Sequence, residues 1–231
     1  ALEEMSGGID HEKNNKLTII RNLSSQLSEI MDEPEIDKKM VQEMSEKIIK
    51  TTDRISKIIK GLRAFSRDGS LDPFASVNVK QLVEETLSLC KEKFHTHGVK
   101  IEVEQISENL YFDGRSVEIS QVLLNLLNNA HDAIEKMDDR WIKIGVLDKN
   151  ENIEIRIIDC GKGIPEEIQK KLFQPFFTTK DIGKGTGLGL SISLGLVESN
   201  KGKLQIDNSC ENTCFVLCLP KKHVSSTSVA S

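Results

Sequence analysis

The chain has 231 residues, of which 38% are hydrophobic and 29% are charged, and its formal net charge at pH 7 is -5. This length can bury the core of one large domain or two smaller ones, and the composition is that of an ordinary globular protein. The acidic balance excludes the basic footprint of a nucleic-acid-binding protein. No stretch approaches the roughly 18 apolar residues of a membrane helix, so any membrane attachment is expected only through segments outside this chain.

The N-terminal residues, 1–66, predict a helical hairpin. The sequence Asp32-Glu-Pro-Glu35 separates the two arms, and its proline stops the first helix. Apolar residues recur at spacings of three and four in both arms, although the polar Glu12 and Lys16 interrupt the first. The predicted seam of the first arm is Leu2, Met5, Ile9, Ile19, Leu23 and Leu27 or Ile30. That of the second is Val41, Met44, Ile48, Thr51, Ile55, Ile58, Leu62 and Phe65.

Two amphipathic helices cannot enclose a core by themselves. We therefore expect two copies of the chain to pair, so that their hairpins form a dimeric four-helix bundle. The alternative is a monomeric hairpin that packs on the rest of the chain.

Residues 67–78 are rich in turn formers and predict a linker, and residues 79–220 mix helical and strand patterns. This mixture predicts an α/β sandwich, in which helices cover a sheet, and makes the fold class α+β. Residues 221–231 are expected to be a disordered tail. The expected helices are 79–95, 116–137 and 188–199, and the expected strands are 100–104, 142–147, 153–159, 203–206 and 214–219.

The five cysteines are odd in number and contain no Cys-x-x-Cys pair. This favours unpaired, mostly buried thiols in a reducing compartment over disulfides or a metal site. Cys214 and Cys218 are expected to share one face of a strand. The other three are Cys90, Cys160 and Cys210.

Four polar, glycine-bearing motifs follow one another between residues 121 and 190. In the first, Gln121, Asn125 and Asn129 are spaced four residues apart on the expected helix, so their amides align along one edge. An amide oxygen can ligate a Mg²⁺ ion that also holds water and phosphate oxygens. The alternative is a row of surface asparagines. The apolar face of this helix should contain Ile119, Val122, Leu123, Leu126, Leu127, Ala130, Ala133 and Ile134.

The second motif begins with Asp159 at the end of an apolar strand and continues with Gly161 and Gly163. A carboxylate there can accept a hydrogen bond from the exocyclic amine of adenine, and the glycines let the backbone approach the ring. An ordinary turn at a strand end would have the same appearance.

The third and fourth motifs are Phe173-Gln-Pro-Phe-Phe-Thr-Thr-Lys180 and Gly185-Thr-Gly-Leu-Gly-Leu-Ser-Ile192. The glycines precede an expected helix, whose free N–H groups attract anions such as phosphates. The pattern is neither a P-loop nor a Rossmann fingerprint. Residues 178–184 are polar and predict a flexible lid over a nucleotide.

The four motifs resemble the N, G1, F and G2 boxes of the sensor histidine kinases, both in their order and in their residue patterns. The resemblance extends from the hairpin to Pro220. It implies a catalytic domain of the GHKL or Bergerat type, with ATP and Mg²⁺ as cofactors. It places Asn129, assisted by Asn125, on the metal. It also implies nucleotide contacts for Asp159, Gly161, Gly163, Thr179, Lys180, Gly185, Gly187, Leu188, Gly189 and Thr213.

His11 is the expected phosphate acceptor, because His11-Glu-Lys-Asn-Asn-Lys-Leu17 resembles the H box of the same family. A neutral imidazole is nucleophilic near pH 7, and Glu12 can act as its general base or orient it. Two residues depart from the family pattern: Lys13 replaces an apolar residue and Lys16 replaces a proline. The resemblance also associates Asn15 with dephosphorylation of the partner regulator.

The interpretation is therefore the transmitter region of a sensor histidine kinase, a homodimer in the cytoplasm. It would phosphorylate itself on His11 and pass the phosphoryl group to an aspartate in the receiver domain of a response regulator. One alternative is a GHKL-type ATPase, but those enzymes use a glutamate base where this chain has Asn125. The other is a pseudokinase that acts as a dimeric scaffold.

Overall fold

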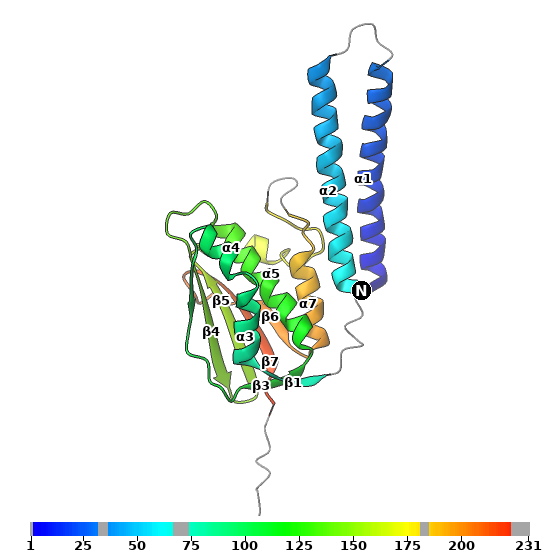
Figure 1. The fold of residues 1–231 in the computed structure, drawn as a ribbon. Helices are drawn as coiled ribbons and strands as arrows, with labels where there is room; N and C mark the ends of the chain where they lie inside the picture. The colour runs from blue at the N-terminus through cyan, green and yellow to red at the C-terminus, as the bar shows by residue number, and fades with distance from the viewer. Residues whose placement is uncertain (1, 32–36, 67–73, 181–184, 223–231) are drawn as a thin grey trace, which may run out of the picture. The chain divides into compact units, whose positions relative to one another are not determined.

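The computed structural model describes residues 2–31, 37–66, 74–180 and 185–222; the side chains of residues 2–14, 54 and 56–66 are not described. The chain divides into two compact units. One contains the two N-terminal helices together with Gln174–Leu188, and the other contains the mixed α and β region (Figure 1).

The N-terminal unit contains the helices α1 (Leu2–Ile30) and α2 (Lys38–Ser66), which pack along each other. Asp37 caps α2, because its carboxylate accepts from the N–H groups of Lys39 at 2.9 Å and Met40 at 3.2 Å. In α2, Met44 is buried, and the half-buried positions are Val41, Ser45, Ile48, Thr51 and Ile55. The predicted seam of the second arm is therefore confirmed as far as Ile55, and the side chains of Ile58, Leu62 and Phe65 lie outside the described part.

In the first arm, the side chains of the predicted seam residues Leu2, Met5 and Ile9 lie outside the described part, and one of the remaining seam residues was wrong. Ile19 is 44% exposed, whereas its neighbour Ile20 is half-buried. The covered positions follow strict steps of four and three residues, so the seam passes through the half-buried Lys16 and ends at the buried Ile30. Several apolar side chains of the hairpin remain exposed in the single chain: Leu17, Ile19, Met31, Met40 and Ile49.

The second unit contains a five-stranded mixed sheet in the order β2-β4-β5-β7-β6. Strand β2 (Lys100–Val103) runs parallel to β4 (Trp141–Lys149), and the other pairs are antiparallel. The remaining strands are β5 (Asn152–Asp159), β6 (Lys203–Ile206) and β7 (Thr213–Pro220). All five predicted strands are present.

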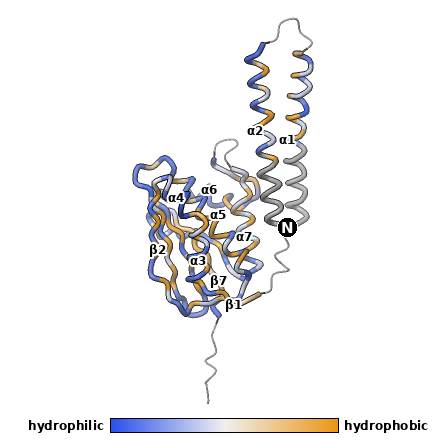
Figure 2. Tube along the Cα trace, viewed as in Figure 1, coloured by the Kyte–Doolittle hydropathy of each residue, from blue (hydrophilic) through white to orange (hydrophobic). Residues whose placement is uncertain are grey.

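Helices cover one face of this sheet, as Figure 1 shows for α3 (Val79–Ser88), α5 (Ser116–Ile134) and α7 (Gly189–Ser199). Hydrophobic positions lie along the strands and these helices (Figure 2). The largest fully buried side chains are Phe94, Phe112, Ile119, Leu126, Leu127, Ile134, Ile142, Ile153, Ile155, Ile157 and Leu217.

The helix expected over residues 79–95 is two helices, α3 and α4 (Lys91–Thr96). The last turn of α3 tightens, because the N–H groups of Leu89 and Cys90 bond to carbonyls three residues earlier, at 3.2 and 3.1 Å. The break places Phe94 in the core with no exposed surface. The short helix α6 (Glu166–Gln169) was not predicted.

The predicted face of α5 was wrong at one position. Ala133 is exposed and His131 is buried instead. The His131 ring stacks on Phe94, with the ring centroids 5.3 Å apart, and meets the edge of His97 at 5.0 Å. His131 is therefore part of the packing between α4 and α5.

The expected linker ends earlier than residue 78. Residues Ala75–Asn78 form strand β1, which pairs antiparallel with β3 (Tyr111–Gly114), a strand that was not predicted.

At the C-terminal end, the first two residues of the expected disordered tail make backbone hydrogen bonds. The N–H of Lys221 donates to Glu151 and that of Lys222 donates to Tyr111, at 2.9 and 2.7 Å. The rest of the expected disordered tail, residues 223–231, lies outside the described part.

Within the described residues, no helix is both long enough and apolar enough to span a membrane. All five cysteines are unpaired, but the expectation that most of them are buried was wrong, because Cys90 and Cys214 are buried and the other three are half-buried.

We predict that Ile119→Ala lowers the free energy of unfolding by about 2–5 kcal/mol, because it leaves a cavity beneath α5. Ile119 has no exposed surface. The measurement is urea unfolding followed by circular dichroism. Val117→Ala is the matched control on the same helix, since Val117 is 59% exposed, and it should change stability by no more than about 0.5 kcal/mol. Equal effects of the two changes would contradict the packing described for α5.

Candidate functional site

The Asp159 side chain lies on the helix-covered face of the sheet, at the end of β5. Alternation along the strand buries Ile153, Ile155 and Ile157 on that face, and Asp159 continues the series with only 2% of its surface exposed. In the antiparallel register Asp159 is opposite Thr213, the first residue of β7. The sheet therefore holds a carboxylate and a hydroxyl next to each other under the helices.

Burial raises the pKa of Asp159 above its ordinary value of 3.8, because a charged carboxylate loses water there. Two hydrogen bonds oppose this rise, one from the N–H of Gly161 at 2.8 Å and one from the hydroxyl of Thr213. The acceptor predicted for an adenine amine is therefore buried and held in position by two donors.

The glycines that follow Asp159 have different roles. A side chain at Gly161 would stand 2.6 Å from the Asp159 carboxylate and 2.8 Å from the Thr213 hydroxyl, so only glycine allows this close approach. Gly163 has a φ of +81°, in the left-handed region that favours glycine. The carbonyl of Gly161 accepts from the backbone N–H of Thr213 at 3.1 Å and from the Asn212 side chain at 3.2 Å.

Asn125 joins α5 to the first turn of α7. Its Nδ2 donates to the Ser193 hydroxyl at 2.8 Å. Its Oδ1 would lie 2.5 Å from a Cβ placed on Gly189, the first residue of α7. The glycine therefore lets an amide oxygen come close to a helix N-terminus, where anions bind favourably.

Asn129 is half-buried one turn further along α5, on the same side of the helix as Asn125. Its neighbour Asn128 has a different role, because it accepts from Lys93 of α4 at 2.8 Å and donates to the Leu124 carbonyl. The two predicted metal ligands, Asn125 and Asn129, are thus on one edge of α5, and Asn125 on this edge contacts α7.

The segment Gln174–Leu188 belongs to the other compact unit and brings the third and fourth motifs together. A side chain at Gly185 would stand 2.7 Å from the Thr178 hydroxyl and 3.3 Å from the Lys180 side chain. Gly187 has a φ of +69°, and a Cβ there would overlap the backbone of Phe176. Glycine is therefore required at position 187, whereas a side chain at position 185 would have to displace the side chains of Thr178 and Lys180.

Thr179, which was predicted for the lid, is exposed, and Leu188, which was predicted as a nucleotide contact, is 2% exposed. The N–H of Leu188 bonds to the Thr186 hydroxyl at 3.3 Å, just before α7 begins. Residues 181–184, the centre of the predicted lid, lie outside the described residues.

His11, Glu12 and Asn15 all lie in α1. The side chains of His11, Glu12 and Lys13 are outside the described part, and Asn15 is exposed.

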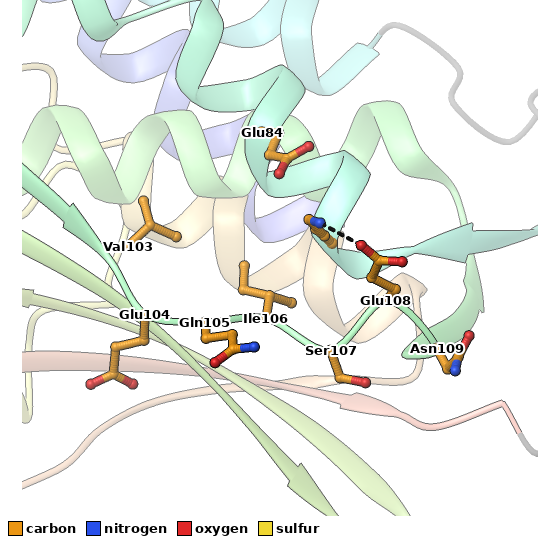
Figure 3. A pocket seen from close by; sticks show the side chains of 9 residues that line it. Glu84, Val103, Glu104, Gln105, Ile106, Ser107, Glu108 and Asn109 are labelled. Carbon is orange, nitrogen blue, oxygen red and sulfur yellow. Dashed lines mark hydrogen bonds and ion pairs between the residues drawn. The ribbon is translucent and has the colours of Figure 1, made fainter.

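A cavity of about 460 Å³ opens beside the Gly161–Gly163 turn. It is lined by Gly163, Asp207, Cys210, Asn212 and Thr213, among others, so it adjoins the predicted adenine contacts. A larger cavity of about 820 Å³, shown in Figure 3, lies between α3 and the segment after β2 and contains none of the predicted site residues. Four charged side chains line it together with apolar ones: Lys80 pairs with Glu108 at 2.9 Å, and Glu84 and Glu104 are also in the wall.

The sequence interpretation missed two residues that position the site. Ser193 is 2% exposed and fixes the Asn125 amide, and Asn212 supports the Gly161 carbonyl. Ser193 follows Gly189 by four residues, so helical spacing could have placed it on the same side of α7. Asn212 is in a turn, where no periodicity indicates orientation.

The chain is similar to known proteins in sequence and in fold. Residues 114–223 match the family described as "Histidine kinase-, DNA gyrase B-, and HSP90-like ATPase". The signal transduction histidine-protein kinase AtoS of Escherichia coli is 35% identical over 227 residues, which cover 95% of this chain and 35% of AtoS. The two-component sensor PprA of Pseudomonas aeruginosa is 31% identical over 230 residues, or 95% of this chain and 24% of PprA. The chain thus spans about a quarter to a third of these relatives.

Solved structures agree with the sequence relatives. The catalytic domain of histidine kinase ThkA superimposes with a TM-score of 0.58 at 34% identity, over 64% of this chain and 95% of that domain. A structure of ThkA in complex with the response regulator protein TrrA has a TM-score of 0.63 at 27% identity and covers 96% of this chain and 62% of ThkA. The chain therefore belongs to the sensor histidine kinases, and its α/β unit is their ATP-binding catalytic domain.

Proposed function

We propose that this chain is a transmitter region that phosphorylates itself on His11 with ATP and then passes the phosphoryl group to an aspartate of a response regulator. The observation that supports transfer over hydrolysis is the side chain at position 125. An amide, held by Ser193 at 2.8 Å, stands where the related ATPases have a glutamate base. Without that base, water is not activated, and an external nucleophile can take its place.

In this proposal Asp159 accepts from the adenine amine, and Thr213 and Gly161 hold the carboxylate in position. Gly189 and the start of α7 receive the phosphates, because free N–H groups of a helix N-terminus attract anions. Thr179 and Lys180 would belong to the lid, Gly185 and Gly187 would line the phosphates together with Gly189, and Leu188 would contact the nucleotide.

The amide oxygens of Asn125 and Asn129 suit Mg²⁺, which prefers oxygen ligands and retains water and phosphate oxygens. The contact between Asn125 and Gly189 supports this role, because it directs an amide oxygen toward the N-terminus of α7. When bound, the ion would neutralise phosphate charge.

An imidazole nitrogen of His11 then forms a bond to the γ-phosphorus, the bond to the bridging oxygen of ADP breaks, and ADP leaves. Glu12 orients the ring and accepts its proton. In the second step a carboxylate oxygen of the regulator attacks the phosphohistidine, and His11 is regenerated. Lys13 and Lys16 supply positive charge in the same helix, which favours approach of anionic phosphates.

We also infer that the chain forms a homodimer through the hairpin. Leu17, Ile19, Met40 and Ile49 are exposed apolar side chains of the hairpin, and pairing with a second copy would remove such side chains from water. A monomeric mass in sedimentation velocity would contradict this.

Because ATP is the proposed phosphate donor, we expect this region to lie in the cytoplasm.

Asp159→Asn should weaken binding of ATP roughly ten- to hundred-fold, because an amide N–H₂ would face the adenine amine and leave a buried donor unpaired. Isothermal titration with a non-hydrolysable analogue measures the effect. Asp148→Asn is the control, since Asp148 is on the same sheet but pairs with Lys221 at 2.7 Å. Burial raises the pKa of Asp159, so this carboxylate takes up a proton at a higher pH than an exposed aspartate does. As the solution is acidified, the affinity for ATP should therefore begin to fall at that higher pH. Equal affinity of the two variants would refute the assigned contact.

His11→Ala should abolish acid-labile, base-stable labelling by γ-labelled ATP while leaving nucleotide affinity unchanged, since the change removes only the acceptor. His95→Ala, an exposed histidine of α4, should label like the natural chain. Persistent label in the His11 variant would mean that another residue is the acceptor.

Asn15→Ala should slow dephosphorylation of the regulator by about tenfold or more, because the amide no longer positions water. Labelling of His11 should stay within about twofold, since Asn15 is not the nucleophile. The assay follows loss of label from a phosphorylated receiver domain, with Asn14→Ala as the neighbouring control. An unchanged rate in the Asn15 variant would remove this residue from the mechanism.

A further inference from the structure

Three side chains meet where β6 turns into β7. A carboxylate oxygen of Asp207 and the sulfur atoms of Cys210 and Cys214 all lie within 4.8 Å of one another. Asp207 and Cys214 are opposite each other, because the Asp207 N–H donates to the Cys214 carbonyl at 2.9 Å. The turn brings Cys210 back, so that its sulfur is 3.7 Å from Asp207 Oδ2. The proposed kinase reaction uses none of these three side chains.

The surroundings disfavour a metal ion at this cluster. Asp207 Oδ2 already accepts from Arg156 at 2.6 Å, and Oδ1 accepts from the N–H and the hydroxyl of Ser209 at 2.9 and 2.6 Å. A cation would have to displace the guanidinium or bind beside its positive charge. The two thiols then remain as ligands, whereas a structural zinc site uses about four.

The two thiols have complementary accessibility. Cys214 has no exposed surface, whereas Cys210 is half-buried and lines the cavity of about 460 Å³ beside the nucleotide site. Cys210 also lies in the turn before β7 rather than in a strand. Because the β6–β7 register runs from Lys203 to Ile206 against Phe215 to Cys218, drawing the sulfur atoms together to the bond length of about 2.05 Å breaks none of these strand pairs.

We propose that Cys210 and Cys214 are a site of reversible oxidation, at which a two-electron oxidant such as hydrogen peroxide forms an intramolecular disulfide. The accessible Cys210 sulfur attacks a peroxide oxygen, and the O–O bond breaks. The departing hydroxide takes the proton of the Cys210 thiol and leaves as water, so that Cys210 becomes a sulfenic acid. The Cys214 sulfur then attacks the Cys210 sulfur. The S–O bond breaks, and the hydroxide leaves with the Cys214 proton as a second water.

The disulfide would close a short ring around Asn212 and Thr213. These residues hold the Gly161 carbonyl at 3.2 and 3.1 Å, and the Thr213 hydroxyl bonds to Asp159. Closure of the ring shifts these partners, so oxidation weakens ATP binding on the order of fivefold, as is typical of coupling between two sites. This consequence, unlike formation of the bond, rests on the proposed function.

The test exposes the complete chain to increasing hydrogen peroxide, then counts free thiols and maps linked peptides by mass spectrometry. We expect loss of two thiols, a linked peptide pair that contains Cys210 and Cys214, and full reversal by dithiothreitol. Cys210→Ser and Cys214→Ser should each prevent the link. Cys218→Ser is the matched control, because Cys218 is half-buried on the same strand and has Glu154 and Lys203 as charged neighbours; it should still form the link.

Affinity for an ATP analogue is then compared before and after oxidation, with Cys210→Ser treated in parallel. Weaker binding only in the natural chain supports the regulatory consequence, and equal binding in both states overturns it. Failure of the reduced chain to bind the analogue would refute the proposed function but leave the thiol result intact. An unchanged thiol count, a link to another cysteine, or protection of both thiols by zinc alone would overturn the proposed site.

Discussion

The pairing of β5 with β7 is the constraint on which the proposed nucleotide site depends. Strand alternation directs Ile153, Ile155 and Ile157 into the core, and the same alternation continues to Asp159. A carboxylate is thus buried at the end of the strand, with its desolvation partly offset by the Gly161 N–H and the Thr213 hydroxyl. A shift of register by one residue would turn Asp159 to the opposite face and remove the site.

A second constraint acts where α5 meets α7. Gly189 at the start of α7 leaves room for the Asn125 side chain, and Ser193 one turn later fixes its amide. The polar edge of α5 therefore meets a helix N-terminus, while the opposite side of α5 packs on the sheet through residues such as Ile119 and Leu126. One helix thus provides both core packing and the amides proposed to hold a metal.

The elements that sequence patterns predicted well are those with strong periodicity, such as β5 and α5. The errors fall where local patterns are ambiguous. Adjacent Ile19 and Ile20 both satisfy an apolar stripe, and packing against the other arm selects Ile20. The sequence has no glycine or proline at the break between α3 and α4. This break depends on the burial of Phe94 in the core. Strand β1 is too short to be recognised without its partner β3.

By itself the sequence determined the kind of chemistry, because the four motifs and the histidine motif specify residue types at fixed spacings. It also predicted Asp159 as the acceptor for the adenine amine and Asn125 as the residue that favours phosphoryl transfer over hydrolysis. Only the tertiary structure decided which side chains support them, namely Thr213, Ser193 and Asn212, and which thiols meet at the β6–β7 turn. The physical reason is that these contacts join residues far apart in the chain or within turns, where strand pairing and helix packing, not local spacing, set the distances.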